Sequence, residues 1–197
     1  MRPLPALAVA LALLGAGCAS TPPRLYRLSA SEPAPAPAPA PAPATAASAP
    51  ATLAVGPVTV PAQVDRPQIV LVVGANQVRV DEFSRWAAPL ADDITGVLVA
   101  DLARRLGTTE VWAYADTVRP AAELRVAVQV QRFDIVPGDV ALLDAAWSLQ
   151  PAAGAPRNGQ SRVREPIDGG SIDAAVAAQS RALARVSEDI ARAIRAR

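Results

Sequence analysis

The chain lacks histidine and lysine, and it contains a single cysteine. Imidazole, amine and thiolate groups supply most of the metal ligands and activated nucleophiles in enzymes. The sequence also contains no nucleophile elbow, phosphate-binding loop, dinucleotide fingerprint or zinc-ligand spacing. A lone cysteine excludes a disulfide within the chain. The sequence therefore predicts no enzyme activity, no metal and no cofactor.

A surplus of either charge is also missing. Nineteen arginines stand against 18 acidic residues, and loss of Arg2 with an N-terminal signal would leave 18 against 18. A neutral domain has no electrostatic footprint for nucleic acid, which needs a basic surplus. Two pairs of adjacent acids, Asp92-Asp93 and Glu188-Asp189, fall in predicted helices. Neighbours on a helix diverge by about 100°, so neither pair directs two carboxylates at one substrate atom.

The only cysteine, Cys18, follows a short apolar segment. Arg2 precedes the apolar run 4–14, and the small residues 15–17 follow it. This order is typical of a secretory signal peptide, and the run is too short for a membrane-spanning helix of about 20 residues. Because the cysteine comes directly after the small residues, the stretch resembles a bacterial lipobox, with Gly15 where leucine is usual. We expect residues 1–17 to be removed and the Cys18 thiol to be acylated; an ordinary secretion signal is the alternative.

Residues 18–51 are interpreted as a lipidated N-terminus and an alanine- and proline-rich tether. Proline occupies every second position from 33 to 43, which disfavours helix and favours polyproline II. A 23-residue segment, 29–51, would span roughly 70 Å as a spacer that holds the domain away from a membrane. Residues 24–28 form a short predicted strand. If Tyr26 pairs into the sheet, the tether is instead an insertion in a loop, and both alternatives remain open.

Residues 52–197 carry the periodicity that forms a core, over the length of one domain. Alternating or continuous apolar runs predict strands, and apolar groups at helical spacing predict two helices. The predicted fold is α/β: a single domain with a mixed or antiparallel β-sheet of about five to seven strands covered by two main helices. The strands are expected at 53–58, 68–73, 77–80, 111–114, 124–131, 140–149 and 161–165, and the helices at 90–106 and after Ser171.

Two stretches, 55–70 and 83–90, are the most distinctive of the chain. Prolines force an extended path through the first, and an aromatic ring lies just before the first helix in the second. The residues of interest could form a structural latch between loop and helix, or a docking surface for another protein. The residues alone favour the latch, and the two roles can overlap. The candidates are Asp65, Arg66, Pro67, Gln68, Arg85, Trp86 and Pro89.

These stretches carry a family resemblance. The motifs GPV-x-VP-x-x-VDRPQIV, RWA-x-PL and Q-S-x-A-L-x-x-V-S, with a strand ending at Phe133 and Trp147 within a strand, resemble the PqiC family. Its members are auxiliary lipoproteins of ABC-type transport systems that work with MCE-domain proteins. The similarity covers nearly all of residues 52–197, and Tyr26 is similar to the family's tyrosine shortly after the lipidated cysteine.

The resemblance implies a non-catalytic role. The protein would be anchored by acyl chains in the outer membrane, facing the periplasm, and would bind an MCE-domain protein that carries lipids between membranes, supporting membrane integrity. Ala19 after Cys18, where an aspartate would favour inner-membrane retention, agrees with that location. Homo-oligomers are also implied. The alternative is a structural envelope lipoprotein that binds peptidoglycan or an outer-membrane assembly machine.

Overall fold

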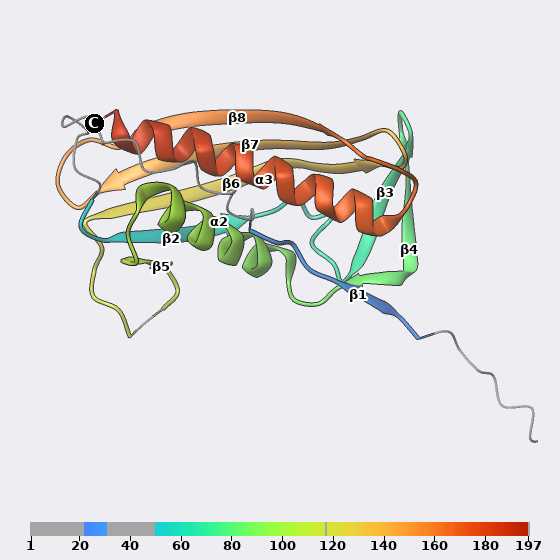
Figure 1. Cartoon of the computed structure of the whole chain (residues 1–197), viewed down its shortest axis with the longest axis horizontal. Coiled ribbons are helices and arrows are strands. Elements are labelled where there is room, and N and C mark those ends of the chain that lie inside the picture. The colour runs from blue at the N-terminus through green and yellow to red at the C-terminus, as the bar shows by residue number, and fades with distance from the viewer. Residues whose placement is uncertain (1–21, 31–49, 117, 197) are drawn as a thin grey trace, which may run out of the picture.

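The structure, a computed structural model, describes residues 22–30, 50–116 and 118–196. In this part of the chain two helices lie on one face of a five-stranded sheet, and a three-stranded sheet lies toward one end (Figure 1). The α/β fold with two helices in one domain is as predicted. The elements are β1 (Arg24–Tyr26), β2 (Leu53–Thr59), β3 (Gln68–Gly74), β4 (Gln77–Trp86), α2 (Leu90–Leu106), β5 (Val111–Ala113), β6 (Leu124–Val136), β7 (Val140–Pro151), β8 (Arg157–Pro166) and α3 (Ile172–Arg195).

The five-stranded sheet has the order β5-β2-β6-β7-β8. Strand β2 runs parallel to both of its neighbours, and β6, β7 and β8 form an antiparallel meander. Along β6, Leu124, Val126 and Val128 are buried, whereas the residues between them are less buried. Helices cover only one face of this sheet, so the alternation divides each strand into a core side and an open side.

Both helices begin and end at local signals. Helix α2 has the predicted bounds, and Gly107 follows it in the left-handed conformation, with φ 69°, that a helix end favours. Ser171 caps α3 by accepting a hydrogen bond from the Ala174 N–H at 3.1 Å. Glu188 and Arg192, four residues apart on α3, form an ion pair at 3.3 Å. Neither helix in the described residues is long and apolar enough to cross a membrane.

The strands form two sheets, whereas the sequence predicted one. The smaller sheet has the order β1-β4-β3, with β1 parallel and β3 antiparallel to β4. The carboxylate of Asp81 accepts hydrogen bonds from the Phe83 and Ser84 N–H groups at 3.0 and 2.8 Å, and the β3–β4 register shifts at the same place. The first part of β4 pairs with β3 alone, whereas Arg85 near its end lies opposite both Gln68 of β3 and Leu25 of β1.

Strand β1 belongs to the domain. Tyr26 lies opposite Trp86 in the register, and its carbonyl accepts from the Ala87 N–H at 2.8 Å. Leu28 is buried, and its N–H donates to the Asp93 carboxylate at 2.7 Å. The segment 29–51 therefore connects two parts of one folded unit, which favours the loop over the spacer. The domain begins at β1 rather than at residue 52, and Cys18 and residues 31–49 lie outside the described residues.

The edge of the large sheet is joined to α3 by a chain of polar contacts. The indole N–H of Trp147 donates to the Ser161 hydroxyl at 3.2 Å, and that hydroxyl donates to the Asp189 carboxylate at 2.7 Å. Gly159 lies opposite Trp147 in the register, and a Cβ built there would lie 2.2 Å from two carbons of the indole ring. The ring thus occupies the space that a side chain at position 159 would need.

Candidate functional site

The loop that leads into β3 has a fixed backbone. The Asp65 N–H donates to the Pro61 carbonyl at 3.1 Å, and the Arg66 N–H donates to the Val64 carbonyl at 2.8 Å. Val64 itself is buried in the core. These contacts hold the short turn in place, and they leave the Asp65 and Arg66 side chains exposed.

Trp86 attaches this loop to the core. The residue is only 6% exposed, and its ring meets Phe133 edge to face at a centroid distance of 6.1 Å. The backbone N–H of Trp86 donates to the Pro67 carbonyl at 2.7 Å. Gln68 and Arg85 lie opposite each other in the adjoining strands, both half-buried. The contact between loop and helix entrance is therefore made by the Trp86 ring and the backbone.

The residues at the start of α2 and just before it complete a groove next to this contact. The groove has a volume of about 320 Å³. Four of the predicted candidates line it, and its other lining residues come from the stretch just before α2 and from the first residue of α2. Neither Asp65 nor Arg66 forms a side-chain hydrogen bond or ion pair with another residue that the structure describes. The lining residues are Asp65, Arg66, Pro67, Ala87, Ala88, Pro89 and Leu90.

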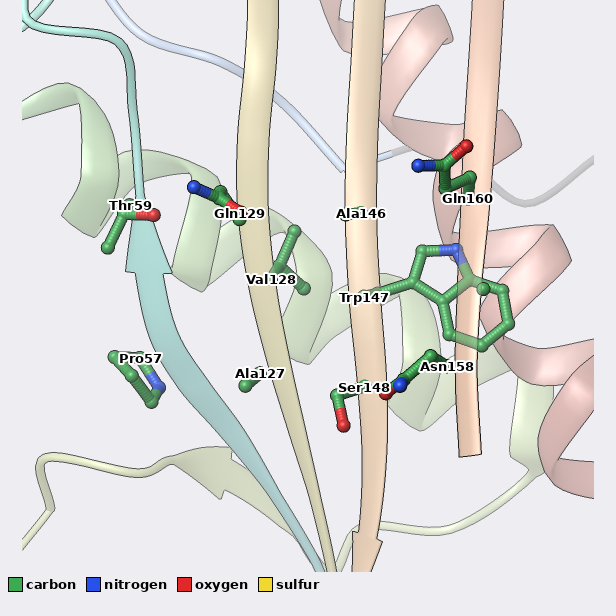
Figure 2. Close-up of a pocket in the computed structure, with 11 residues that line it drawn as sticks. Pro57, Thr59, Ala127, Val128, Gln129, Ala146, Trp147, Ser148, Asn158 and Gln160 are labelled. Carbon is green, nitrogen blue, oxygen red and sulfur yellow. The ribbon is translucent and has the colours of Figure 1, made fainter. Parts of the chain in front are cut away.

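A larger hollow, of about 740 Å³, lies on the five-stranded sheet, lined by residues of four neighbouring strands. Figure 2 shows these residues on β2, β6, β7 and β8. Small alanines lie between amide and hydroxyl side chains, and none of the lining residues carries a charge, so the hollow offers hydrogen bonds but no acid or base. The solvent-facing residues of the alternating strands were the signal of this hollow in the sequence, but only the strand register shows that the lining residues lie together. The lining residues are Pro57, Thr59, Ala127, Val128, Gln129, Ala146, Trp147, Ser148, Asn158, Gly159 and Gln160.

A third hollow, of about 460 Å³, lies beside β5. The guanidinium of Arg119 lies 5.4 Å from the Trp112 ring centroid, and that of Arg125 lies 4.6 Å from the Tyr114 ring centroid. The Arg125 Nε also donates to the Gln150 amide oxygen at 3.0 Å. Both cations are thus held against aromatic faces within the protein.

Three of the four adjacent acids in the helices, Asp93, Glu188 and Asp189, bind other groups of the protein. Burial raises the pKa of the Asp93 carboxyl, while the Leu28 N–H bond and the Arg27 charge act in the opposite direction. Glu188 and Asp189 both bind Arg192, at 3.3 and 2.9 Å. Across the described part of the chain, no three acidic or cysteine side chains come together in a group that could hold a metal ion.

Comparison with known proteins supplies a family and a fold. A family model described as ABC-type transport auxiliary lipoprotein component matches residues 26–191. A crystal structure of a protein described only as uncharacterized is 19% identical, with a TM-score of 0.70, over 88% of this chain and 99% of its own. A protein of Xanthomonas campestris is 17% identical, with a TM-score of 0.60, over 85% and 92%. At these identities the two structures show a shared fold. No curated protein sequence matches the chain significantly.

Proposed function

Since the chain belongs to the family of ABC-type transport auxiliary lipoprotein components, we propose that it is a non-catalytic auxiliary subunit of a lipid transport system that spans the cell envelope. Acyl chains on Cys18 would hold it in the outer membrane, with the domain in the periplasm. The partner would be an MCE-domain protein that carries lipids between the membranes and thereby supports membrane integrity.

The groove beside the helix entrance is the surface that we assign to this partner. Its backbone is held by the Pro67–Trp86 hydrogen bond and by the buried Trp86 ring. A loop that is already fixed loses little conformational entropy when a partner binds. The side chains of Asp65 and Arg66 are exposed above it and unused by the rest of the described chain. A carboxylate beside a guanidinium gives a partner a directional pattern, which supplies specificity more than affinity.

The anchor follows from the lipobox and from the character of the domain. The described helices offer no membrane-spanning segment, and the side chains of the cleaved protein balance in charge. A single acyl chain binds a membrane only weakly, whereas two or more give stable attachment. The diacyl or triacyl cysteine expected at position 18 would meet that need. The residue after it, Ala19, agrees with sorting to the outer membrane.

The polar groups of the domain support a role without catalysis. The hollow of about 740 Å³ on the five-stranded sheet is lined by no acidic or basic side chain. Of the adjacent acids in the two helices, Asp93 accepts from an N–H group and Glu188 and Asp189 bind arginine, whereas Asp92 is exposed. The absence of histidine and lysine from the whole chain removes the usual general bases and amine nucleophiles.

Copurification tests this proposal. The full-length lipoprotein, extracted in a gentle detergent, should bring down an MCE-domain protein. The double charge reversal Asp65→Arg with Arg66→Glu should reduce the recovered partner by about tenfold or more, since like charges across an interface are repulsive. Arg164→Glu is the matched control, because Arg164 is also exposed but lies on β8, away from the groove. That variant should bind normally.

Three outcomes would contradict the proposal in different ways. Recovery of no MCE-domain protein with the unaltered chain would contradict the transport role itself. Equal recovery with the loop double variant would remove only the assignment of the groove. Sedimentation of the purified protein with peptidoglycan, without an MCE partner, would instead favour a structural envelope lipoprotein.

A further inference from the structure

We infer that the outer face of β1 and β4, carrying Leu25 and Phe83, rests on the lipid bilayer to which Cys18 is tethered. The inference rests on the proposed acylation and goes beyond it, because it assigns the side of the domain that faces the membrane. Leu25 is 66% exposed and Phe83 is 54% exposed. Both side chains are large and apolar, and more than half of each residue is exposed to solvent.

The register places the two side chains on one face. Leu25 lies opposite Arg85, and Arg24 lies opposite Ser84, in the parallel pairing of β1 with β4. Phe83 and Arg85 alternate along β4 with the buried Ser84 and Trp86, so Phe83 shares the face of Leu25. Tyr26 and Trp86 point to the other face and pack on the core. Leu25 and Phe83 are therefore neighbours on the side of the sheet that the core does not use.

The length of chain before β1 brings this face to the membrane. Five residues lie between Cys18 and Arg24, so six residue-to-residue steps join them. Fully extended, they reach about 21 Å. Exposed apolar residues alone are common on protein surfaces. Here, however, the acyl anchor would keep β1 within about 21 Å of the bilayer surface, and the long segment 29–51 adds no reach because it follows β1 in the chain.

The charges around the pair suit a headgroup region. Arg24 and Arg27 are exposed on either side of Leu25, and Arg85 lies opposite it. Arginine stems can lie along apolar surface while their guanidinium groups bind lipid phosphates. Three acids are near: Asp81 uses a carboxylate oxygen to accept from two backbone N–H groups, Glu82 is exposed, and Asp93 accepts from the Leu28 N–H and interacts with the charge of Arg27. The three arginines and the three acids balance in charge, so the apolar side chains and the short tether, rather than a basic surplus, support contact with lipid.

Site-specific fluorescence in vesicles tests this orientation. Cys18 is the only native cysteine. Once it is acylated, a cysteine introduced at another position is the only thiol that can be labelled. Leu25→Cys and Phe83→Cys are prepared as separate full-length lipoproteins, so that a folding failure in one leaves the other. Each carries an environment-sensitive dye and is reconstituted in vesicles of phosphatidylethanolamine and phosphatidylglycerol.

Val118→Cys is the matched control. Val118 is apolar and 91% exposed, and it lies in the connection after β5. Figure 1 shows β5 and β1 apart along the long axis of the molecule. Lipids that carry a quencher near the top of their acyl chains should quench the dye at positions 25 and 83 at least about twofold more than at 118, because interfacial residues lie 5–10 Å into the boundary region.

Each result decides between distinct claims. Equal, weak quenching at positions 25, 83 and 118 in protein that floats with the vesicles would overturn the orientation and leave the anchor intact. Protein that fails to float would contradict the acylation, and the orientation would fall with it. Shielding of the dyes only after a protein fraction is added would show that another protein, not lipid, covers Leu25 and Phe83.

Discussion

Replacement of Trp86 by alanine separates a structural role of this ring from a role in docking. The residue is 6% exposed and meets Phe133 at a centroid distance of 6.1 Å. Loss of a buried tryptophan ring costs about 3–5 kcal/mol, and an edge-to-face pair adds about 0.5–1.5 kcal/mol to what burial alone gives. Because these terms overlap, we expect Trp86→Ala to lower the free energy of unfolding by about 4 kcal/mol.

Urea unfolding followed by circular dichroism measures this loss. With a urea dependence of about 2 kcal/mol per molar, the midpoint should fall by about 2 M. Phe83→Ala is the control, because Phe83 lies on the same strand and is 54% exposed. Its effect should be about 1 kcal/mol or less. A loss below about 1 kcal/mol for Trp86→Ala would refute the view that the ring fixes the loop to the core.

Three further predictions, made with four substitutions, test particular contacts. Gly159→Ala should destabilise the protein by about 1–3 kcal/mol in urea unfolding, because its Cβ would lie 2.2 Å from the Trp147 ring. Gly96→Ala in α2 is the control: its Cβ would meet nothing within 4 Å, and it should stabilise the protein by up to about 1 kcal/mol. A stability change of the same sign in both variants would contradict the packing of the Trp147 ring on Gly159. Ser171→Ala should cost about 1 kcal/mol through loss of the cap, and an unchanged midpoint would contradict it. The pKa of Asp93 is raised in the folded state by burial, so the native protein binds this proton more tightly than the unfolded chain, whose value is 3.8. The stability that this group contributes is therefore lost as pH rises from 3.8 through its folded-state pKa. Over that pH window, the unfolding free energy of Asp93→Asn minus that of the unaltered protein should increase. A difference that decreases or stays constant with pH would contradict a raised pKa of Asp93.

The helices could be predicted because their signals are local. Gly107 and Ser171 set the ends of α2 and α3 within a turn of the residues that they cap. Strand β8 was less predictable. It begins at Arg157, before the predicted start at residue 161, and Gly159 within it leaves room for the Trp147 ring of another strand. Periodicity does not contain that information.

The position of β1 and the shape of the groove depended on distant contacts. Leu28 binds Asp93 across 65 residues of sequence, and Tyr26 pairs with Trp86. Nothing local distinguishes a tether from a loop when the deciding partner lies so far along the chain. Four of the candidates line one groove, but only the structure separates the buried Trp86 from the exposed Asp65 and Arg66.

The intact mass of the mature protein, purified from membranes, tests the anchor on which both the transport role and the orientation depend. The account predicts a chain that begins at Cys18 and carries the added mass of two or three acyl chains. A mature chain that begins elsewhere, or one that carries an unmodified thiol at Cys18, would contradict it.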